Sequence, residues 1–300
     1  MSPELNATVG HLIDSHRLPV HYAYQFGKFI VPLANRLACA PGPRIIGIQG
    51  SQGSGKSTLA DFLKAVLEIE HSLSVEVVSL DDFYLSKFQR SNLASTVHPL
   101  LQTRGVPGTH DTNLMISVFD RFKQSKSFTL PSFDKSIDDL KLKTDWRTVE
   151  SQPDLLIFEG WCVGASPQHE SELFRPINDL EQIQDADKKW RRYVNQTLSD
   201  DYAEAFAKID ELVVLEVPSF KCVYRWRSEQ EQKLIARLKE AGQSTASTMT
   251  VPQLKHFIQH YQRLTQHCLT TLPTVADHVL GIDEDHRFVS LKSAADKETH

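Results

Sequence analysis

One short segment constrains the fold of this chain more than any other. Residues 50–57 read GSQGSGKS, which matches the pattern G-x-x-x-x-G-K-[ST] in full. The apolar run of residues 44–49 before it is suited to a buried parallel strand, and an amphipathic helical pattern over residues 59–67 follows it. A strand, a glycine-rich turn and a helix in this order predict a loop whose backbone N–H groups point at phosphate oxygens.

The residues of this loop have expected roles in holding the phosphate chain of a nucleotide. Lys56 is expected to reach the β- and γ-phosphates, and the Ser57 hydroxyl is expected to ligate Mg²⁺. The helix that begins near Lys56 adds the positive end of its dipole. We therefore predict ATP and Mg²⁺ as cofactors. The predicted nucleotide-binding residues are Gly50, Ser51, Gln52, Gly53, Ser54, Gly55, Lys56, Ser57 and Thr58.

The rest of the chain alternates strand-like and helix-like apolar patterns. Further strands are expected at residues 75–80, 155–158, 212–217, 278–282 and 288–291. Helices are expected at residues 22–37, 112–122, 220–241 and 252–270. This alternation predicts an α/β fold, a P-loop NTPase-type parallel sheet flanked by helices. The long polar stretch between the second and third strands predicts an acceptor-binding insertion.

Composition excludes several classes of function. The formal net charge is −5, so the chain lacks the basic surface that nucleic-acid binding favours. Its four cysteines form no C-x-x-C pair, which argues against a zinc site or a disulfide framework. The first residues lack the features of a secretory signal, and no apolar run approaches the length of a membrane span. We expect a cytoplasmic protein with no membrane partner.

Carboxylates follow the second and third predicted strands. Ligands of open parallel sheets bind beyond the carboxyl ends of the strands, so Asp81, Asp82 and Glu159 are expected near the bound phosphates. Asp81 is the predicted base for the attacking hydroxyl and Glu159 a ligand of Mg²⁺ or of water, with Asp82 as the alternative base. The predicted metal site consists of Ser57, Asp81 and Glu159. The competing interpretation is that these acids only cap helices or form turns.

Three segments together resemble a known superfamily. The glycine-rich loop, Asp81-Asp-Phe-Tyr84 and Phe158-Glu-Gly-Trp161 are similar to the P-loop kinases related to uridine kinase, phosphoribulokinase and bacterial pantothenate kinase. In that superfamily the Asp of an Asp-x-Phe-Tyr-like motif usually activates the hydroxyl. The resemblance therefore implies that Asp81 has this role.

Other segments resemble one branch of that superfamily, the D-glycerate 3-kinases. Residues 98–111, HPLLQTRGVPGTHD, look like its HPLL-x-x-RG-x-x-G-[ST]-HD segment, and residues 130–136, LPSFDKS, look like its DKS element. Residues 224–231, YRWRSEQE, resemble its RWR-x-x-QE segment. The resemblance implies one kinase domain over residues 41–295 after an N-terminal helical segment, residues 1–40. Within that domain we expect an insertion at about residues 85–150 and a lid-like helical region at about residues 167–208.

The resemblance also implies an acceptor site, because glycerate carries a carboxylate that needs a cation or N–H donors. The predicted acceptor-binding residues are Asp82, Tyr84, Arg104, His110, Asp111, Asp134 and Lys135. Turn formation is the competing interpretation for the segment around Arg104. A lid arginine is expected to stabilise the developing charge, with Arg225 favoured over Arg227. Both arginines also fit helix-surface pairs with an acid four residues on.

These residues predict ATP-dependent phosphoryl transfer, with Lys56, Asp81, Glu159 and Arg225 as the catalytic set and a small alcohol as the partner. D-glycerate is the expected acceptor and 3-phosphoglycerate the product. Two alternatives stay open at this point. One is a kinase for a pantothenate-like or nucleoside-like alcohol. The other is a nucleotide-dependent regulatory ATPase, which transfers phosphate to water.

Overall fold

The computed structural model describes residues 1–242, 244–245 and 248–294. The helices are α1 Pro3–Ser15, α2 Tyr22–Gln25, α3 Val31–Leu37, α4 Lys56–His71, α5 Lys87–Thr96, α6 Thr112–Lys123, α7 Asp179–Gln184, α8 Lys189–Thr197, α9 Ala203–Phe206, α10 Phe220–Glu240 and α11 Val251–Val275. The strands are β1 Arg44–Gln49, β2 Val75–Ser79, β3 Phe128–Leu130, β4 Phe133–Asp134, β5 Asp139–Leu140, β6 Arg147–Val149, β7 Leu155–Gly160, β8 Glu211–Glu216, β9 His278–Ile282 and β10 Phe288–Ser293.

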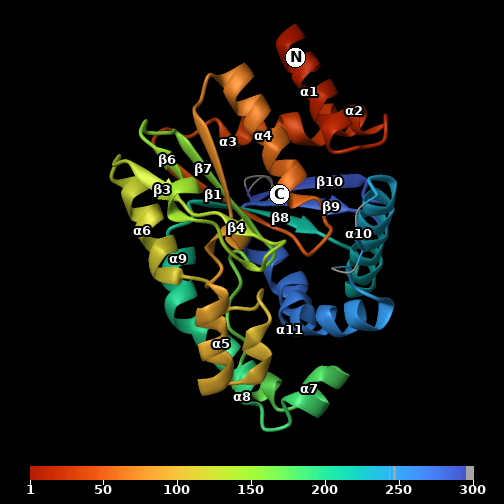
Figure 1. Cartoon of the computed structure of the whole chain (residues 1–300). Helices are drawn as coiled ribbons and strands as arrows, with labels where there is room; N and C mark the ends of the chain where they lie inside the picture. The colour runs from red at the N-terminus through yellow and green to blue at the C-terminus, as the bar shows by residue number, and fades with distance from the viewer. Residues whose placement is uncertain (243, 246–247, 295–300) are drawn as a thin grey trace.

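A six-stranded sheet in the order β10-β9-β8-β1-β7-β2 forms the centre of the molecule (Figure 1). Every neighbouring pair is parallel except β9 and β10, which form an antiparallel pair at the C-terminal edge. The predicted α/β fold with a mainly parallel sheet is therefore confirmed. The long insertion is also present, because residues 80–154 separate β2 from β7, the next strand of this sheet along the chain.

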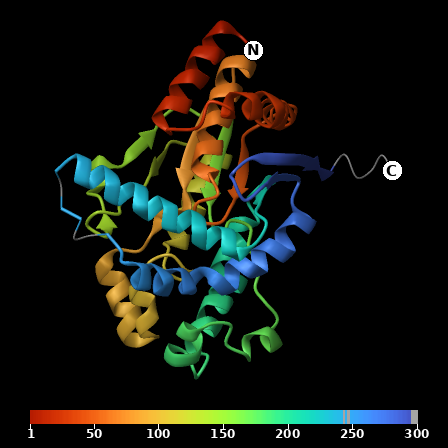
Figure 2. The same ribbon diagram turned by 90° about the vertical axis from the view of Figure 1, so that its right-hand side faces the viewer.

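Helices cover both faces of the sheet because its central strands are apolar on both faces. In β1, Ile46 and Ile48 belong to the core on the side of α4 and α10, whereas Ile45 belongs to the core on the side of α6 and α11. Figure 2 shows α10 and α11 crossing in front of the sheet after a turn of the molecule. The result is a three-layer arrangement, which leaves only the strand ends open to a ligand.

The N-terminal segment belongs to the same core as the sheet. Leu5 of α1 and Phe26 in the π-helical turn η1 (Phe26–Ile30) are buried in one cluster with Phe62 of α4. The rings of Phe26 and Phe62 lie 5.5 Å apart. Helices α1, α2 and α3 lie within residues 1–40, and α1 and α3 pack onto α4 (Figure 1).

Two parts of the chain differ from the sequence-based expectation. Residues 167–208 form short helical pieces that pack beneath the sheet, where Leu180 and Trp190 share a small core with Leu101 and Val106. The insertion also holds α5 and four short strands, β3 to β6, that the apolar pattern did not predict. These strands are only two or three residues long, too short for a periodic signal.

Across the described ranges, no helix combines the length and the apolar character that crossing a membrane requires.

The shared core makes a prediction about residues 1–40. Leu5 is fully buried, so Leu5→Ala should lower the free energy of unfolding by about 2–5 kcal/mol, through lost burial and the cavity left behind. Leu142→Ala, at a position that is 74% exposed, is the matched control and should change it by less than about 0.5 kcal/mol. Urea denaturation of both variants measures the difference. Equal effects would show that the N-terminal helices do not contribute to the cooperative core.

Candidate active site

Strand pairing brings the predicted phosphate-binding and acidic residues to one edge of the sheet. In the register of the parallel strands, Ile48 lies beside Glu159 and Gln49 beside Gly160, while Ser79 at the end of β2 also lies beside Glu159. The glycine-rich loop therefore begins next to Glu159. On the far side of β7, β2 continues into a short 3₁₀ turn that carries Asp81.

The glycine-rich loop needs glycine at specific positions. Gly53 and Gly55 have φ values of +80° and +90°, in the left-handed region that other residues avoid. A Cβ on Gly53 would also lie 2.9 Å from the Cβ of Trp226, and one on Gly50 would lie 2.4 Å from the Ser54 Oγ. Gly55 caps α4, so the positive end of the helix dipole points into the loop.

Several buried polar atoms around the loop lack a hydrogen-bond partner within the described residues. They are Ser51 Oγ, Gln52 Oε1, Ser54 Oγ and Glu159 Oε2. Buried polar atoms are normally hydrogen-bonded, so a cluster of unpaired ones indicates a place built for a polar ligand. The two serine hydroxyls belong to the loop and can donate to the phosphate oxygens of a nucleotide, whereas Gln52 Oε1 and Glu159 Oε2 can only accept, from a donor group or a cation.

Glu159 and Ser57 carry oxygen atoms of the kind that Mg²⁺ prefers as ligands. The Ser57 hydroxyl donates a hydrogen bond to Glu159 Oε1 at 2.7 Å, which holds the two side chains together. The other carboxylate oxygen, Oε2, lies 4.0 Å from Lys56 Nζ. Carboxylate and hydroxyl oxygens beside a phosphate-binding loop fit the preference of Mg²⁺ for oxygen.

Asp81 lies in the cleft with two partners. The Tyr84 hydroxyl donates a hydrogen bond to Asp81 Oδ1 at 2.7 Å, and Lys135 Nζ lies 2.6 Å from Asp81 Oδ2. Burial by itself raises the pKa of Asp81, but the charge and hydrogen bond of Lys135, the charge of Lys56 and the Tyr84 hydrogen bond together lower it to about 2. Asp81 is therefore an ionised carboxylate at neutral pH.

Lys135 comes from a hairpin that the sequence pattern did not predict. Strands β4 and β5 pair around Phe133 and Leu140, and the turn between them carries Lys135. The Phe133 N–H donates to the Asp82 carboxylate at 3.4 Å, which attaches the hairpin to the 3₁₀ turn after β2. The insertion thus supplies the cation that faces Asp81.

His110 supports the site from behind instead of lining the cleft. Its ring stacks on Tyr84 with centroids 4.6 Å apart, and Nδ1 forms a short hydrogen bond with the Tyr202 hydroxyl. Burial lowers the pKa of His110 to about 3, so the imidazole is neutral. This ring fixes the orientation of the tyrosine that donates to Asp81. Acceptor contact, the role predicted for His110, does not follow from this position.

Three other predicted acceptor ligands have structural roles. Asp82 accepts hydrogen bonds from the N–H of Ser79 in a capping box, and Asp111 caps α6 by accepting from the Leu114 N–H at 2.9 Å. Asp134 accepts from both the N–H and the hydroxyl of Ser136 within its own turn. Asp82, Asp111 and Asp134 do not line the cleft. These three acids therefore cap helices or form turns, as the competing interpretation of the acidic residues proposed.

Arg104 lines the cleft and its backbone is held by two aromatic residues. The Tyr261 hydroxyl donates to the Arg104 carbonyl at 2.9 Å, and the Trp161 indole N–H donates to the next carbonyl, that of Gly105, at 2.9 Å. The Arg104 guanidinium is paired with Asp138 in the β4–β5 turn and lies over the Phe133 ring. Trp161 thus acts by positioning the arginine.

The lid arginine that faces the cleft is Arg227, not Arg225. The Arg225 guanidinium donates to the Glu284 carbonyl and lies 3.7 Å from Glu229, on the side of α10 away from the cleft. Arg227 lines the cleft, and its Nη1 lies 2.8 Å from Glu231 Oε2. Residues two apart on a helix point in nearly opposite directions, so only one of the two can face the phosphates. The expectation for Arg225 is corrected accordingly.

The cleft has a volume of about 420 Å³, within the range of small-molecule sites. Its wall combines the glycine-rich loop, the strand-end acids, the insertion and the two long helices α10 and α11. The residues concerned are Gln52, Gly53, Lys56, Ser57, Ser79, Asp81, Tyr84, Arg104, Lys135, Glu159, Trp161, Arg227, Gln230, Glu231, Leu234, Met249, Phe257 and Tyr261. No residue of the region 167–208, predicted to be lid-like, lines this cleft. Among the described residues, α10 and α11 border it instead.

A phosphate-binding loop at the end of a parallel strand, with an acidic and cationic cleft beside it, defines a P-loop kinase. Comparison with known proteins agrees. Residues 45–166 match the profile described as the phosphoribulokinase/uridine kinase family. The chain is 35% identical over 234 residues to a protein named uncharacterized kinase mug58, from Schizosaccharomyces pombe, covering 73% of this chain and 78% of that one. The chain belongs to the phosphoribulokinase/uridine kinase family.

Two further similarities concern enzymes with a named acceptor. The chain is 27% identical over 260 residues to the chloroplastic D-glycerate 3-kinase of Arabidopsis thaliana, covering 81% of this chain but 53% of that enzyme. A solved structure of D-glycerate 3-kinase from Cryptococcus neoformans superimposes with a TM-score of 0.71 at 24% identity. It covers 90% of this chain and 98% of that one. The structural similarity shows that the fold is shared.

The contacts of Asp81 make a prediction about its titration. Replacing Lys135 with Met removes the largest influence that lowers the pKa of Asp81, while burial continues to raise it. The pKa of Asp81 should therefore move upward from about 2. Carbon-13 NMR titration of the aspartate carboxyls, assigned with Asp81→Asn, measures the shift. Lys141→Met, an exposed lysine next to the same hairpin, is the control and should leave the pKa unchanged. An unchanged pKa in Lys135→Met would contradict the ion pair.

Proposed function

We propose that this kinase transfers the γ-phosphoryl group of ATP to a hydroxyl of D-glycerate, giving 3-phosphoglycerate. The observation that carries the proposal is the position of Arg104 and Lys135 on the cleft that contains Asp81. A small hydroxy acid needs a carboxylate-binding cation close to the group that receives its hydroxyl proton. The names of the two D-glycerate 3-kinases that the chain resembles support the same acceptor.

The nucleotide phosphates would occupy the glycine-rich loop. Backbone N–H groups of the loop and the Lys56 ammonium bind the phosphate oxygens, and Ser57 and Glu159 would hold the magnesium ion. A bound Mg²⁺ would supply positive charge to the phosphate oxygens. Arg227, which also lines the cleft, would offset the charge that develops on the transferred group.

Asp81 would position the attacking hydroxyl. Its carboxylate stays ionised at neutral pH and accepts the hydrogen bond of the acceptor hydroxyl, which directs an oxygen lone pair at the γ-phosphorus. A carboxylate with a pKa near 2 is a weak base. Orientation of the acceptor hydroxyl is thus the main contribution of Asp81. The hydroxyl proton would pass to its carboxylate late in the reaction, as in a loose phosphoryl-transfer transition state.

The acceptor carboxylate would be bound by two cations that keep their present ion pairs. Lys135 is paired with Asp81, and Arg104 is paired with Asp138. An incoming carboxylate would be a second anionic partner for each cation, so no acid of the protein would lose its partner when the acceptor binds. Arginine is suited to a bidentate contact with a carboxylate, which a neutral alcohol cannot make. This selects glycerate over glycerol.

The proposal is tested by coupled measurement of ADP release from MgATP with D-glycerate, pantothenate, uridine or glycerol as acceptor. Strong stimulation by D-glycerate is the expected result, with at most a weak reaction with glycerol and none with pantothenate or uridine. Asp81→Asn should lower the rate about a hundredfold while sparing ATP binding, and Lys56→Ala should abolish turnover. A steady rate of ATP hydrolysis that no alcohol increases would favour the regulatory ATPase instead.

The position of Arg104 leads to a separate prediction about acceptor specificity. Arg104→Gln should raise the KM for D-glycerate about tenfold or more, because a hydrogen bond to a charged group is lost. The same change should have little effect on the weaker reaction with glycerol, which has no carboxylate. Arg121→Gln, an exposed arginine on α6, is the control and should affect neither acceptor. Equal losses with both acceptors would assign Arg104 to the nucleotide instead.

A further inference from the structure

Two arginines share the carboxylate of Asp138, in the turn between β4 and β5. Arg104 Nη1 is paired with Asp138 Oδ1, and Arg90 Nη2 lies 3.0 Å from Asp138 Oδ2. Both guanidinium groups also lie over the Phe133 ring, 5.8 Å from its centroid for Arg90 and 5.5 Å for Arg104. Asp138 therefore helps to fix where Arg104, which lines the cleft, holds its charge.

Arg90 holds Asp138 from the interior of the insertion. It belongs to α5 and its side chain is fully buried. Its guanidinium donates hydrogen bonds to the carbonyl oxygens of Leu85, Gln102 and Asp138, at 3.2, 3.2 and 2.6 Å. An arginine stays charged in a protein, and among the described residues the only acid within ion-pair distance of Arg90 is Asp138. Two permanent positive charges thus share one negative charge.

The two cations on the acceptor side of the cleft are therefore neutralised to different degrees. Lys135 is paired with Asp81 at 2.6 Å, whereas Arg104 has to share Asp138 with a second arginine. Salt screens buried charges much less than exposed ones, so the buried Arg90 keeps its share of the Asp138 charge at ordinary ionic strength. Arg104 is left with a partly balanced positive charge, which suits one further carboxylate.

The backbone at Asp138 is in a conformation that few residue types adopt. Its φ is +57°, in the left-handed region, which Gly, Asn and Asp enter more readily than other residues. In this conformation the Asp138 carbonyl and carboxylate both face Arg90. Asn and Gly can therefore replace Asp138 without a new backbone strain, and each removes the negative charge.

We propose that Asp138 is a specificity-determining residue, which leaves Arg104 enough positive charge for an acceptor with one carboxylate and too little for an acceptor with two. The inference rests on the proposed function, because it takes Arg104 as a ligand of the acceptor carboxylate. Without the Asp138 carboxylate, Arg90 and Arg104 would both be unbalanced, which favours a dianion. Asp138 does not line the cleft, so it acts through Arg104. It also lies beyond residues 130–136, in a segment that no motif marks.

The test uses tartrate, which is glycerate with a second carboxylate in place of one hydrogen on C3 and is a dianion at neutral pH. The rate of 3-phosphoglycerate formation is measured with the full chain in excess Mg²⁺, so that any phosphorylation of tartrate does not enter it. The KM for D-glycerate and the inhibition constant of each tartrate stereoisomer are compared. The variants are Asp138→Asn and Asp138→Gly. Asp145→Asn, an exposed acid of the same insertion that pairs with neither arginine, is the matched control for net charge.

Both Asp138 variants should lower the ratio of the tartrate inhibition constant to the glycerate KM about tenfold, the effect of one unit charge beside a partly exposed cation. Asp145→Asn should leave this ratio within about twofold of wild type. In an Arg104→Gln background, Asp138→Asn should change the ratio by less than about threefold, because Arg90 is buried and does not line the cleft.

An unchanged ratio in both Asp138 variants would overturn the inference, as would a tenfold change that persists without Arg104. Either result would leave the kinase proposal standing, because turnover of D-glycerate would still be observed. A wild-type chain whose ATP turnover D-glycerate does not increase would instead contradict the proposed function, so the two failures are distinguishable.

Discussion

The parallel pairing of β1 with β7 is the interaction on which the rest of the site depends. Its register places Gln49 beside Gly160, so the glycine-rich loop begins next to Glu159. From this single alignment follow the hydrogen bond from Ser57 to Glu159 and the distance between Lys56 and the same carboxylate. Both faces of the sheet are covered by helices, so a one-residue slip would turn every side chain of the strand toward the opposite core and disrupt the packing of both.

Chemistry in the cleft depends on a balance between burial and charge at Asp81. Burial alone disfavours the ionised carboxylate, and a protonated Asp81 would be a poor acceptor for a substrate hydroxyl. The ammonium groups of Lys135 and Lys56 reverse the effect. Lys135 belongs to a hairpin of the insertion and Lys56 to the phosphate loop. The low pKa of Asp81 therefore depends on the positions of both elements. A substrate that draws Lys135 toward its own carboxylate changes this balance.

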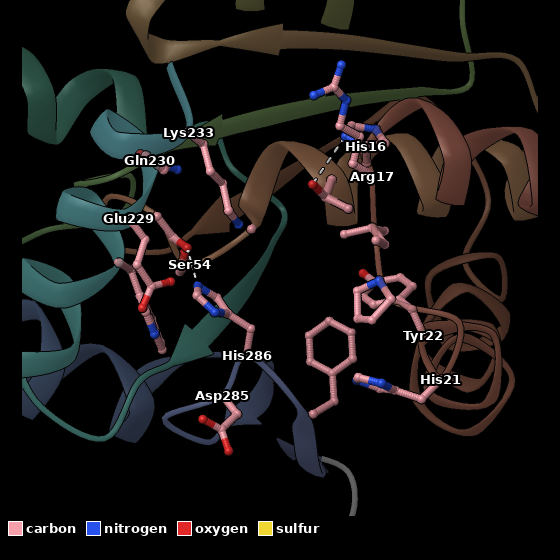
Figure 3. Close-up of a pocket in the computed structure, with 17 residues that line it drawn as sticks. His16, Arg17, His21, Tyr22, Ser54, Glu229, Gln230, Lys233, Asp285 and His286 are labelled. Atoms are coloured by element: carbon pink, nitrogen blue, oxygen red, sulfur yellow. Dashed lines mark hydrogen bonds between the residues drawn. The ribbon is translucent and has the colours of Figure 1, made fainter. Parts of the chain in front are cut away.

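The loop has different surroundings on its two sides. One side borders the cleft that holds Asp81, Glu159 and Lys135, and the other borders a pocket between residues 16–22 and α10 (Figure 3). Gly53 lies against Trp226 of α10, where a side chain would collide with the helix. The loop is packed from both directions, which preorganises it for phosphate.

The α/β fold, the phosphate loop and the two strand-end acids could be predicted from the sequence, because each follows from local spacing. The apolar run RIIGIQ before GSQGSGKS predicts a buried strand that ends in an anion-binding turn. The order of short strands in the insertion, and the short helices of residues 167–208, carry no comparable periodic signal.

Contacts between distant segments set which side chains share the cleft. The fold places Arg227 rather than Arg225 toward the cleft, and His110 behind Tyr84. It also brought residues 16–22 beside the loop. These outcomes depend on helix phase and on contacts between distant segments, and a linear pattern specifies neither. Local spacing sets the chemistry that is available, and packing between distant elements decides where each group points.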